Sequence, residues 1–201
     1  MPANEEGSEQ PEMRELSDAR TFRALAHPVR LSLLETLFLE GPLTATEAGE
    51  RIGESPTTCS FHLRQLAKYG FVEEAGGGRG RARPWRLSTV GTSYSNVHDD
   101  TETELAAGAL TRLLRERALT RYRSWLETKA SYPADWRKAA GDSELVLWVT
   151  PAELQEINQE LLGLLLPRYH ERLSDPSTRP EGSLPVEILV LSYPVVPPAK
   201  A

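Results

Sequence analysis

The stretch "LTATEAGERIGESPTTCSFHLRQLAKYGFVEE", residues 43–74, decides the fold. It opens with a capping box, in which Thr44 and Glu47 satisfy each other's backbone donors at the start of a helix. This short helix ends at Gly53. Ser55 and Pro56 then supply the N-cap and the first-turn proline of a second helix, which runs towards Gly70. Two short helices joined by a tight glycine-containing turn predict a helix-turn-helix.

The second helix has two distinct faces when its residues are placed at about 100° intervals. Cys59 lies on the same side as Leu63 and Leu66, so we expect this face to be buried. The opposite face is basic and hydrogen-bonding, as a helix that reads base edges in the major groove requires. Its candidate DNA-contacting residues are Thr57, Thr58, Ser60, Phe61, Arg64, Gln65 and Lys68. The alternative is an ordinary amphipathic helix with a solvated polar face.

A hairpin follows, with "FVEEA" and "PWRLS" as predicted strands and "GGGRGRA" as the turn between them. Arg79, Arg81 and Arg83 alternate with small residues and are candidates for contact with phosphate or an A·T-rich minor groove. From Ser55 to Val90 there are six basic and two acidic side chains, a net +4, whereas the whole chain carries −6. The local charge favours a DNA-binding wing over a merely flexible charged turn.

The rest of the chain predicts an α+β protein with a winged helix-turn-helix head and a C-terminal α/β region. Residues 1–14 are expected to be disordered, 15–90 to form the DNA-binding domain, and 91–201 to form the dimerisation and candidate effector region. The head should begin with helices at "SDARTFRALA" and "PVRLSLLETLFLE". The C-terminal region should contain a long helix over 101–129, a strand "ELVLWV", a capped helix from Thr150, and a strand "VEILVLSY".

These segments resemble the arsenic-resistance-repressor (ArsR) family of winged helix-turn-helix regulators over about Glu15 to Val90. The resemblance rests on "ALAHPVRLSLLETL", on the stretch quoted first, and on "GGRGRARPWRL". The family pattern is matched at Ser55, Ser60, His62, Leu63, Leu66, Gly70, Phe71 and Val72. The resemblance implies a homodimer whose paired recognition helices enter successive major grooves, and operator binding that an effector controls.

The chain departs from the metal-sensing members of that family. Those members carry paired cysteines near the recognition helix, or Asp and His ligands on the C-terminal helix. Here Cys59 is the only cysteine, and the predicted helix over 101–129 has no histidine. We therefore expect no metal site and no cofactor, and we interpret Cys59 as a small core side chain. A redox role for Cys59 stays open at this stage.

Enzyme motifs are lacking. "GGGRGR" does not have the last glycine of the dinucleotide fingerprint, and no phosphate-binding loop motif occurs. Aromatic residues instead gather in the C-terminal region, where Trp125, Trp136 and Trp148 are candidates to line an effector pocket. Core packing is the alternative interpretation of these tryptophans.

The sequence thus predicts a cytoplasmic, homodimeric transcriptional regulator, more often a repressor, that binds double-stranded DNA and takes a small-molecule effector. A single cysteine fits a reducing compartment, and neither a signal peptide nor a membrane-spanning run is expected. The alternative is a regulator controlled by a protein partner, or by redox chemistry at Cys59, instead of a small molecule.

Overall fold

The structure is a computed structural model that describes residues 13–76, 83–89, 91–95 and 97–197. Contacts divide these residues into two compact units that meet in the sequence at Arg117 and Ala118. The predicted end of the DNA-binding domain at Val90 falls inside the first unit, so that boundary stays a prediction. None of the helices in the described ranges is long and apolar enough to cross a bilayer.

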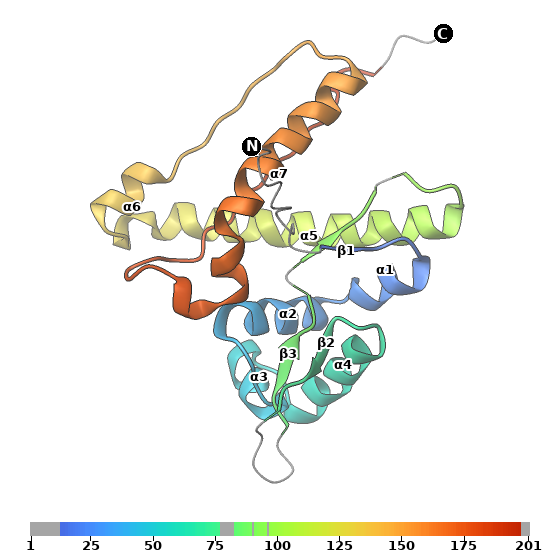
Figure 1. Ribbon diagram of the computed structural model, residues 1–201, viewed down its shortest axis with the longest axis vertical. Helices are drawn as coiled ribbons and strands as arrows, with labels where there is room; N and C mark the ends of the chain where they lie inside the picture. Colours follow the sequence, from blue (N-terminus) through green and yellow to red (C-terminus); the bar gives the residue numbers. More distant parts are fainter. Residues whose placement is uncertain (1–12, 77–82, 90, 96, 198–201) are drawn as a thin grey trace, which may run out of the picture. The chain divides into compact units, whose positions relative to one another are not determined.

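The first unit, called the head below, contains the four predicted short helices in the predicted order (Figure 1). They are α1 Ala19–Leu25, α2 Pro28–Glu40, α3 Ala45–Ile52 and α4 Pro56–Lys68. The cap of α1 is Asp18, whose carboxylate accepts from the backbone N–H groups of Arg20 and Thr21.

Two small sheets complete the backbone of the head. Strand β2, Val72–Glu74, pairs antiparallel with β3, Trp85–Leu87, and Leu43 bridges to Trp85 on the other edge. This confirms the hairpin, although its turn at 77–82 lies outside the described residues. Strand β1, Arg14–Glu15, pairs in parallel with β4, Thr92–Ser93. The sequence did not predict this second pair, because two residues are too few to show a period-2 pattern.

The core of the head is apolar and draws on every helix of the unit. Phe22, Leu33, Leu63 and Leu66 are each 0% exposed. Helix α5, Thr101–Thr128, adds Ala106, Ala107 and Leu110 to the same core. Burying one large apolar side chain contributes about 1.5–3 kcal/mol, so the start of α5 is part of what stabilises the head.

An ion pair fixes α5 on α2. The guanidinium of Arg117 lies 2.6 Å from the Glu35 carboxylate and donates to the Ser32 hydroxyl at 3.2 Å. Both charged side chains are partly shielded from solvent. Helix α5 therefore has two parts: it begins in the core of the head, and after Arg117 it continues into the second unit.

The second unit, residues 118–197, consists of the end of α5 and a further set of helices. These are a 3₁₀ turn at Lys129–Ser131, α6 Ala134–Ala139, α7 Pro151–Ser174 and a 3₁₀ turn at Pro176–Thr178. The predicted capping box of α7 is present, since Glu153 N–H donates to the Thr150 hydroxyl and Thr150 N–H donates to the Glu153 carboxylate. Helix α6 was not predicted.

The two strands predicted for this unit are wrong as elements of the single chain. Residues 144–149 and 186–193 have no regular secondary structure and form no ladder with any described segment. Their apolar, β-branched composition favours an extended backbone, but a strand also needs a neighbour that accepts its hydrogen bonds. The α+β class nevertheless holds, because the head combines helices with the two small sheets.

Candidate DNA-binding surface

The turn between α3 and α4 depends on two glycines. Gly53 adopts φ 73°, ψ 29°, the left-handed conformation that an L side chain rarely takes. A Cβ on Gly49 would lie 2.5 Å from the backbone oxygen of Glu54 and 3.5 Å from the Cys59 sulfur. Gly49 thus allows the two helices to approach each other. The sequence analysis missed it, although a glycine inside a helical pattern is a signal for close packing.

Helix α3 starts at the capping box that the sequence predicted. Thr44 N–H donates to the Glu47 carboxylate at 2.8 Å, and Glu47 N–H donates to the Thr44 hydroxyl at 3.2 Å. The Thr44 hydroxyl also donates to the Glu47 carboxylate, at 2.7 Å, and these two bonds from Thr44 to the carboxylate lower the pKa of Glu47. The box fixes where α3 begins, and thereby where the side chains of its first turn lie.

Helix α4 has the two faces that the sequence predicted. Ser55 caps it by accepting from Thr58 N–H at 3.1 Å. Its buried side chains are Cys59, His62, Leu63 and Leu66. Of the candidate DNA contacts on α4, Thr57, Phe61, Arg64 and Lys68 are exposed, whereas Thr58, Ser60 and Gln65 are half-buried. Phe61 is 50% exposed, an unusual position for phenylalanine.

Cys59 lies in the core, with no exposed surface. Burial raises the pKa of its thiol, and the nearby Glu54 carboxylate acts in the same direction. A thiolate is the reactive form of cysteine, so both effects oppose redox chemistry at this position. The packing of Cys59 against Gly49 gives the side chain a structural role between α3 and α4.

A histidine pair joins the recognition helix to the start of α2. The rings of His27 and His62 lie 4.4 Å apart, centroid to centroid. His27 Nδ1 accepts from Val29 N–H and so caps α2, while Arg30 donates to His62 Nδ1 at 3.4 Å. Burial lowers the pKa of both imidazoles, and the Arg30 charge lowers both further. These shifts favour the neutral form of both rings, and His62 lies inside the head rather than on its DNA-facing surface.

The wing carries its described arginines in ion pairs. Arg83 lies 2.6 Å from Glu74, and Arg86 lies 2.6 Å from Glu73, in each case across the hairpin. The hydrogen bond and charge of Glu74 raise the pKa of Arg83. Arg79 and Arg81 lie outside the described residues. Two of the four wing arginines are thus partly neutralised by acidic neighbours on β2.

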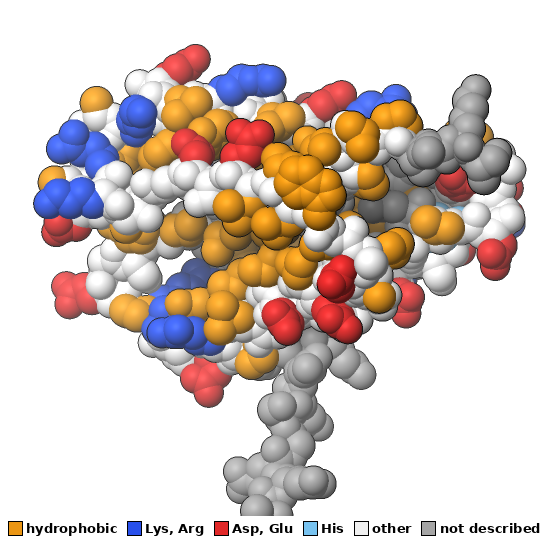
Figure 2. Space-filling view, turned by 90° about the horizontal axis from the view of Figure 1, so that it is seen from above, with side chains coloured by type: hydrophobic (Ala, Val, Ile, Leu, Met, Phe, Trp, Pro, Cys, Tyr) orange, Lys and Arg blue, Asp and Glu red, His pale blue; other side chains and the backbone are white. Residues whose placement is uncertain are grey.

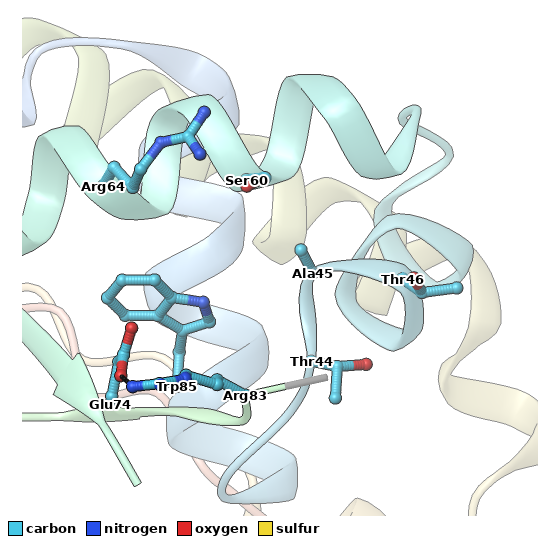
Figure 3. Close-up of a pocket in the computed structure, with 8 residues that line it drawn as sticks. All are labelled: Thr44, Ala45, Thr46, Ser60, Arg64, Glu74, Arg83 and Trp85. Carbon is cyan, nitrogen blue, oxygen red and sulfur yellow. Dashed lines mark hydrogen bonds and ion pairs between the residues drawn. The ribbon is translucent and has the colours of Figure 1, made fainter. Parts of the chain in front are cut away.

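A hollow of about 290 Å³ forms where α3, α4 and the wing meet. Figure 3 shows its residues converging from three elements: the first turn of α3, the middle of α4 and the base of the wing. They are Thr44, Ala45, Thr46, Ser60, Arg64, Glu74, Arg83 and Trp85. The structure brings the predicted Ser60, Arg64 and Arg83 together here. Thr46 and Trp85 were not among the predicted site residues, since their proximity depends on tertiary packing.

Comparison with known proteins places this surface in context. Residues 25–75 match a protein family described as "Helix-turn-helix domain". Those residues run from the end of α1 to the first strand of the wing. This segment is thus similar to a helix-turn-helix domain. Its similarity to regulators confirms the resemblance that the sequence suggested for the head.

Among relatives, this chain is similar to a "Probable mercury resistance operon repressor" of Streptomyces lividans. The two are 46% identical over 54 residues, which cover 27% of this chain and 42% of the relative. The chain therefore spans less than half the length of that relative.

Two solved structures are also similar, at low TM-scores. One is the homodimeric winged helix-turn-helix domain of Mb0332 from Mycobacterium bovis, a possible ArsR-family regulator, with 25% identity over 50% of this chain and 76% of that one, and a TM-score of 0.33. The other is the transcriptional repressor BigR from Xylella fastidiosa, with 26% identity over 49% of this chain and 84% of that one, and a TM-score of 0.31.

The three candidate effector tryptophans are not gathered in one pocket. Trp125 is half-buried, stacks on Tyr122 at 6.0 Å, and lines a shallow hollow with Lys129, Arg137 and Asp142. Trp136 lies half-buried on α6. Trp148 lies in the extended segment and is 94% exposed, so it does not line a pocket within the chain.

Proposed function

We propose that this chain is a cytoplasmic, homodimeric transcriptional repressor that binds duplex DNA through α4 and the wing. The observation that carries the proposal is the arrangement of charge and hydrogen-bonding groups around α4. Arg64 and Lys68 are exposed on the face opposite its buried leucines, and Arg83 reaches the same hollow from the wing. A helix with such a face fits the major groove, which is wide enough to admit it.

Each of the predicted contact residues on α4 has a role that its chemistry suggests. Arg64 is suited to guanine and Gln65 to adenine, since these side chains pair with two acceptor or donor atoms of a base edge. Phe61 and Thr57 offer apolar atoms to a thymine methyl group. Lys68, near the end of the helix, is suited to phosphate, where a single charge is enough.

The wing adds contacts to the DNA backbone. Because Arg83 and Arg86 are paired with glutamates, we assign the larger part of the wing's contribution to Arg79 and Arg81, which are proposed as phosphate or minor-groove contacts. Arg83 contributes only if it leaves Glu74 when DNA binds.

The proposed dimer and the sign of regulation rest on similarity and geometry. The relative in Streptomyces lividans is described as a repressor, and the Mb0332 domain as a homodimer. One recognition helix offers few base contacts, whereas two helices about 34 Å apart read both halves of a palindrome. Residues 91–201 are proposed as the dimerisation and effector region. Trp125 beside Lys129 and Arg137 would suit an anionic effector with an apolar part.

The experiment is selection of bound duplexes from a random DNA pool by the full chain. We expect a palindrome with half-site centres about 10 base pairs apart. Arg64→Ala should cost about 1–3 kcal/mol on the selected duplex and relax the preference at one base pair. Lys68→Ala should weaken all sequences alike, and Arg112→Ala, an exposed arginine on α5, should serve as the matched control. No enriched sequence, or an unaltered preference in Arg64→Ala, would contradict the proposal.

A further inference from the structure

The second unit is rich in apolar residues that the single chain leaves in contact with solvent. Every side chain from Leu145 to Val149 is apolar and between 40% and 94% exposed. Between Leu184 and Val196 the large apolar side chains are 37–70% exposed. Figure 2 shows broad hydrophobic patches on one face of the molecule. One aromatic side chain alone has a surface of roughly 150–250 Å² that can be buried. Monomeric proteins rarely expose contiguous apolar patches larger than a few hundred Å².

Both exposed segments have the composition of buried strands. "LVLWV" at 145–149 and "ILVL" at 188–191 are continuous runs of β-branched, aromatic and leucine residues without a charge, and the second run continues through Ser192 to Tyr193. Runs that are apolar at every position, rather than at alternate positions, are typical of strands covered on both faces. Yet neither segment forms a ladder within the described ranges of the chain. Their backbone donors and acceptors are therefore available to a neighbouring strand.

The second of these segments is already held in place at both ends. Glu187 accepts from Arg121 Nε at 3.1 Å, which ties the start of the segment to the end of α5. The Ser192 hydroxyl donates to the Asn158 side chain at 3.0 Å, which ties its end to α7. These two bonds tie the segment to two helices, which reduces the conformational entropy that pairing with another strand would otherwise cost.

Each chain has two such apolar segments, and this number indicates that a second copy of the chain is the partner with which they pair. Two strands in isolation are marginal, and three or more with a covered face are needed for a stable sheet. Two copies supply four strands, together with two copies of α7 to cover them. The absence of charge in residues 145–149 and 188–193 disfavours a nucleic acid or a charged protein surface as the partner, because those surfaces require charged or polar complements.

We propose that residues 144–149 and 186–193 are strands of a β-sheet that forms only between two copies of this chain. The sheet is the core that the second unit lacks as a monomer, and Trp148 becomes buried in it. This inference rests on the homodimer in the proposed function and specifies how that dimer is built. It also explains why the sequence predicts two strands that the single chain does not form.

The test is hydrogen exchange of the full chain, measured by mass spectrometry at concentrations above and below the dimer midpoint found by sedimentation. Amides in 144–149 and 186–193 should exchange at least about 100-fold more slowly in the dimer than in the monomer, because ladder hydrogen bonds must open first. Amides of α4 should be protected in both states and serve as the internal control. Leu147→Lys should abolish the difference, and Gln155→Lys, a polar position on α7, should retain it.

Three other results would overturn the inference. Protection of both segments in the monomer would show that they pair within one chain. Fast exchange in a dimer that still binds the selected palindrome would place the dimer interface elsewhere and leave the proposed function standing. A chain that remains monomeric at all concentrations and selects no palindrome would remove the proposed function and this inference together.

Discussion

The head and the second unit handle apolar residues in opposite ways. In the head, leucines such as Leu33, Leu63 and Leu66 are completely buried, and its helices begin at side-chain caps. In the second unit, residues as apolar as Leu145 and Trp148 are 80% and 94% exposed. Both sequences are hydrophobic enough to fold. The difference lies in what covers the apolar side chains. In the head they are covered by the same chain, and in the second unit, by our inference, they are covered by a second copy.

The difference explains why one region was predictable and the other was not. A helix-turn-helix is specified by local signals, because caps, glycines and an apolar stripe all occur within about thirty residues. For a sheet that forms between two chains, the only signal in the sequence is the apolar runs of its strands, which do not show what those strands pair with. The substitutions below test whether the stability of each region is the same at every protein concentration, as for a region that folds within one chain, or depends on concentration, as for a region that folds only in a dimer.

The largest effect is expected from deleting core volume in the head. Leu63→Ala should lower the free energy of unfolding by about 2–5 kcal/mol, because it removes buried methyl groups and leaves a cavity. The loss should be the same at every protein concentration. Leu145→Ala is the matched substitution in the second unit, where its effect should appear only under conditions in which the dimer forms. Chemical denaturation of both variants at two protein concentrations separates the two effects. Losses of stability that are equal in the two variants and independent of concentration would show that the two regions do not differ in this way.

A smaller loss is expected where α3 approaches α4. Gly49→Ala should destabilise the head by about 1–3 kcal/mol, since the added methyl would meet the Glu54 carbonyl oxygen at 2.5 Å. Gly108→Ala is the control, because a Cβ there meets nothing within 4 Å on α5. That substitution should leave stability unchanged or raise it slightly. A thermal unfolding series that ranks the two variants in the reverse order would show that the helices are not closely packed at Gly49.

Acid should weaken the head through its histidine pair. His27 and His62 have pKa values below the ordinary 6.5 when folded, so the unfolded chain binds protons more tightly. Their stabilisation is present above pH 6.5 and is lost as pH falls below it, by at most about 1.4 kcal/mol per pH unit for each group. His62→Gln should reduce this slope between pH 6.5 and 5. An unchanged slope would assign the acid sensitivity to other groups, such as the carboxylates that titrate lower.

The smallest effect is expected at the base of the wing. Because Arg83 is paired with Glu74, Arg83→Ala should flatten the log–log salt dependence of DNA binding by less than the roughly 0.9 units of a full phosphate contact. Glu74→Gln, which releases Arg83, should strengthen binding at low salt. If Arg83→Ala instead flattened the log–log slope by the full value of about 0.9, the ion pair would have to open completely on DNA.

How far the sequence determined the result can be judged from particular residues. The phase of α4, with Cys59 inside and Arg64 outside, followed from helical periodicity alone. The capping boxes at Thr44 and Thr150 followed from spacing. Gly49, the histidine pair and the ion pairs of the wing depend on which helices meet, and local patterns do not contain that information. Trp148 was assigned to a pocket because composition shows that a ring is apolar but not what covers it.

In the proposed dimer, two heads joined through the second unit bind one DNA site. Hydroxyl-radical footprinting of the full chain on the selected duplex tests it most directly. We predict two protected patches with centres about 10 base pairs apart, both weakened together in Leu147→Lys while the head remains folded, and both retained in Gln155→Lys. A single protected patch, or two patches that persist in Leu147→Lys when that variant sediments as a monomer, would contradict the account.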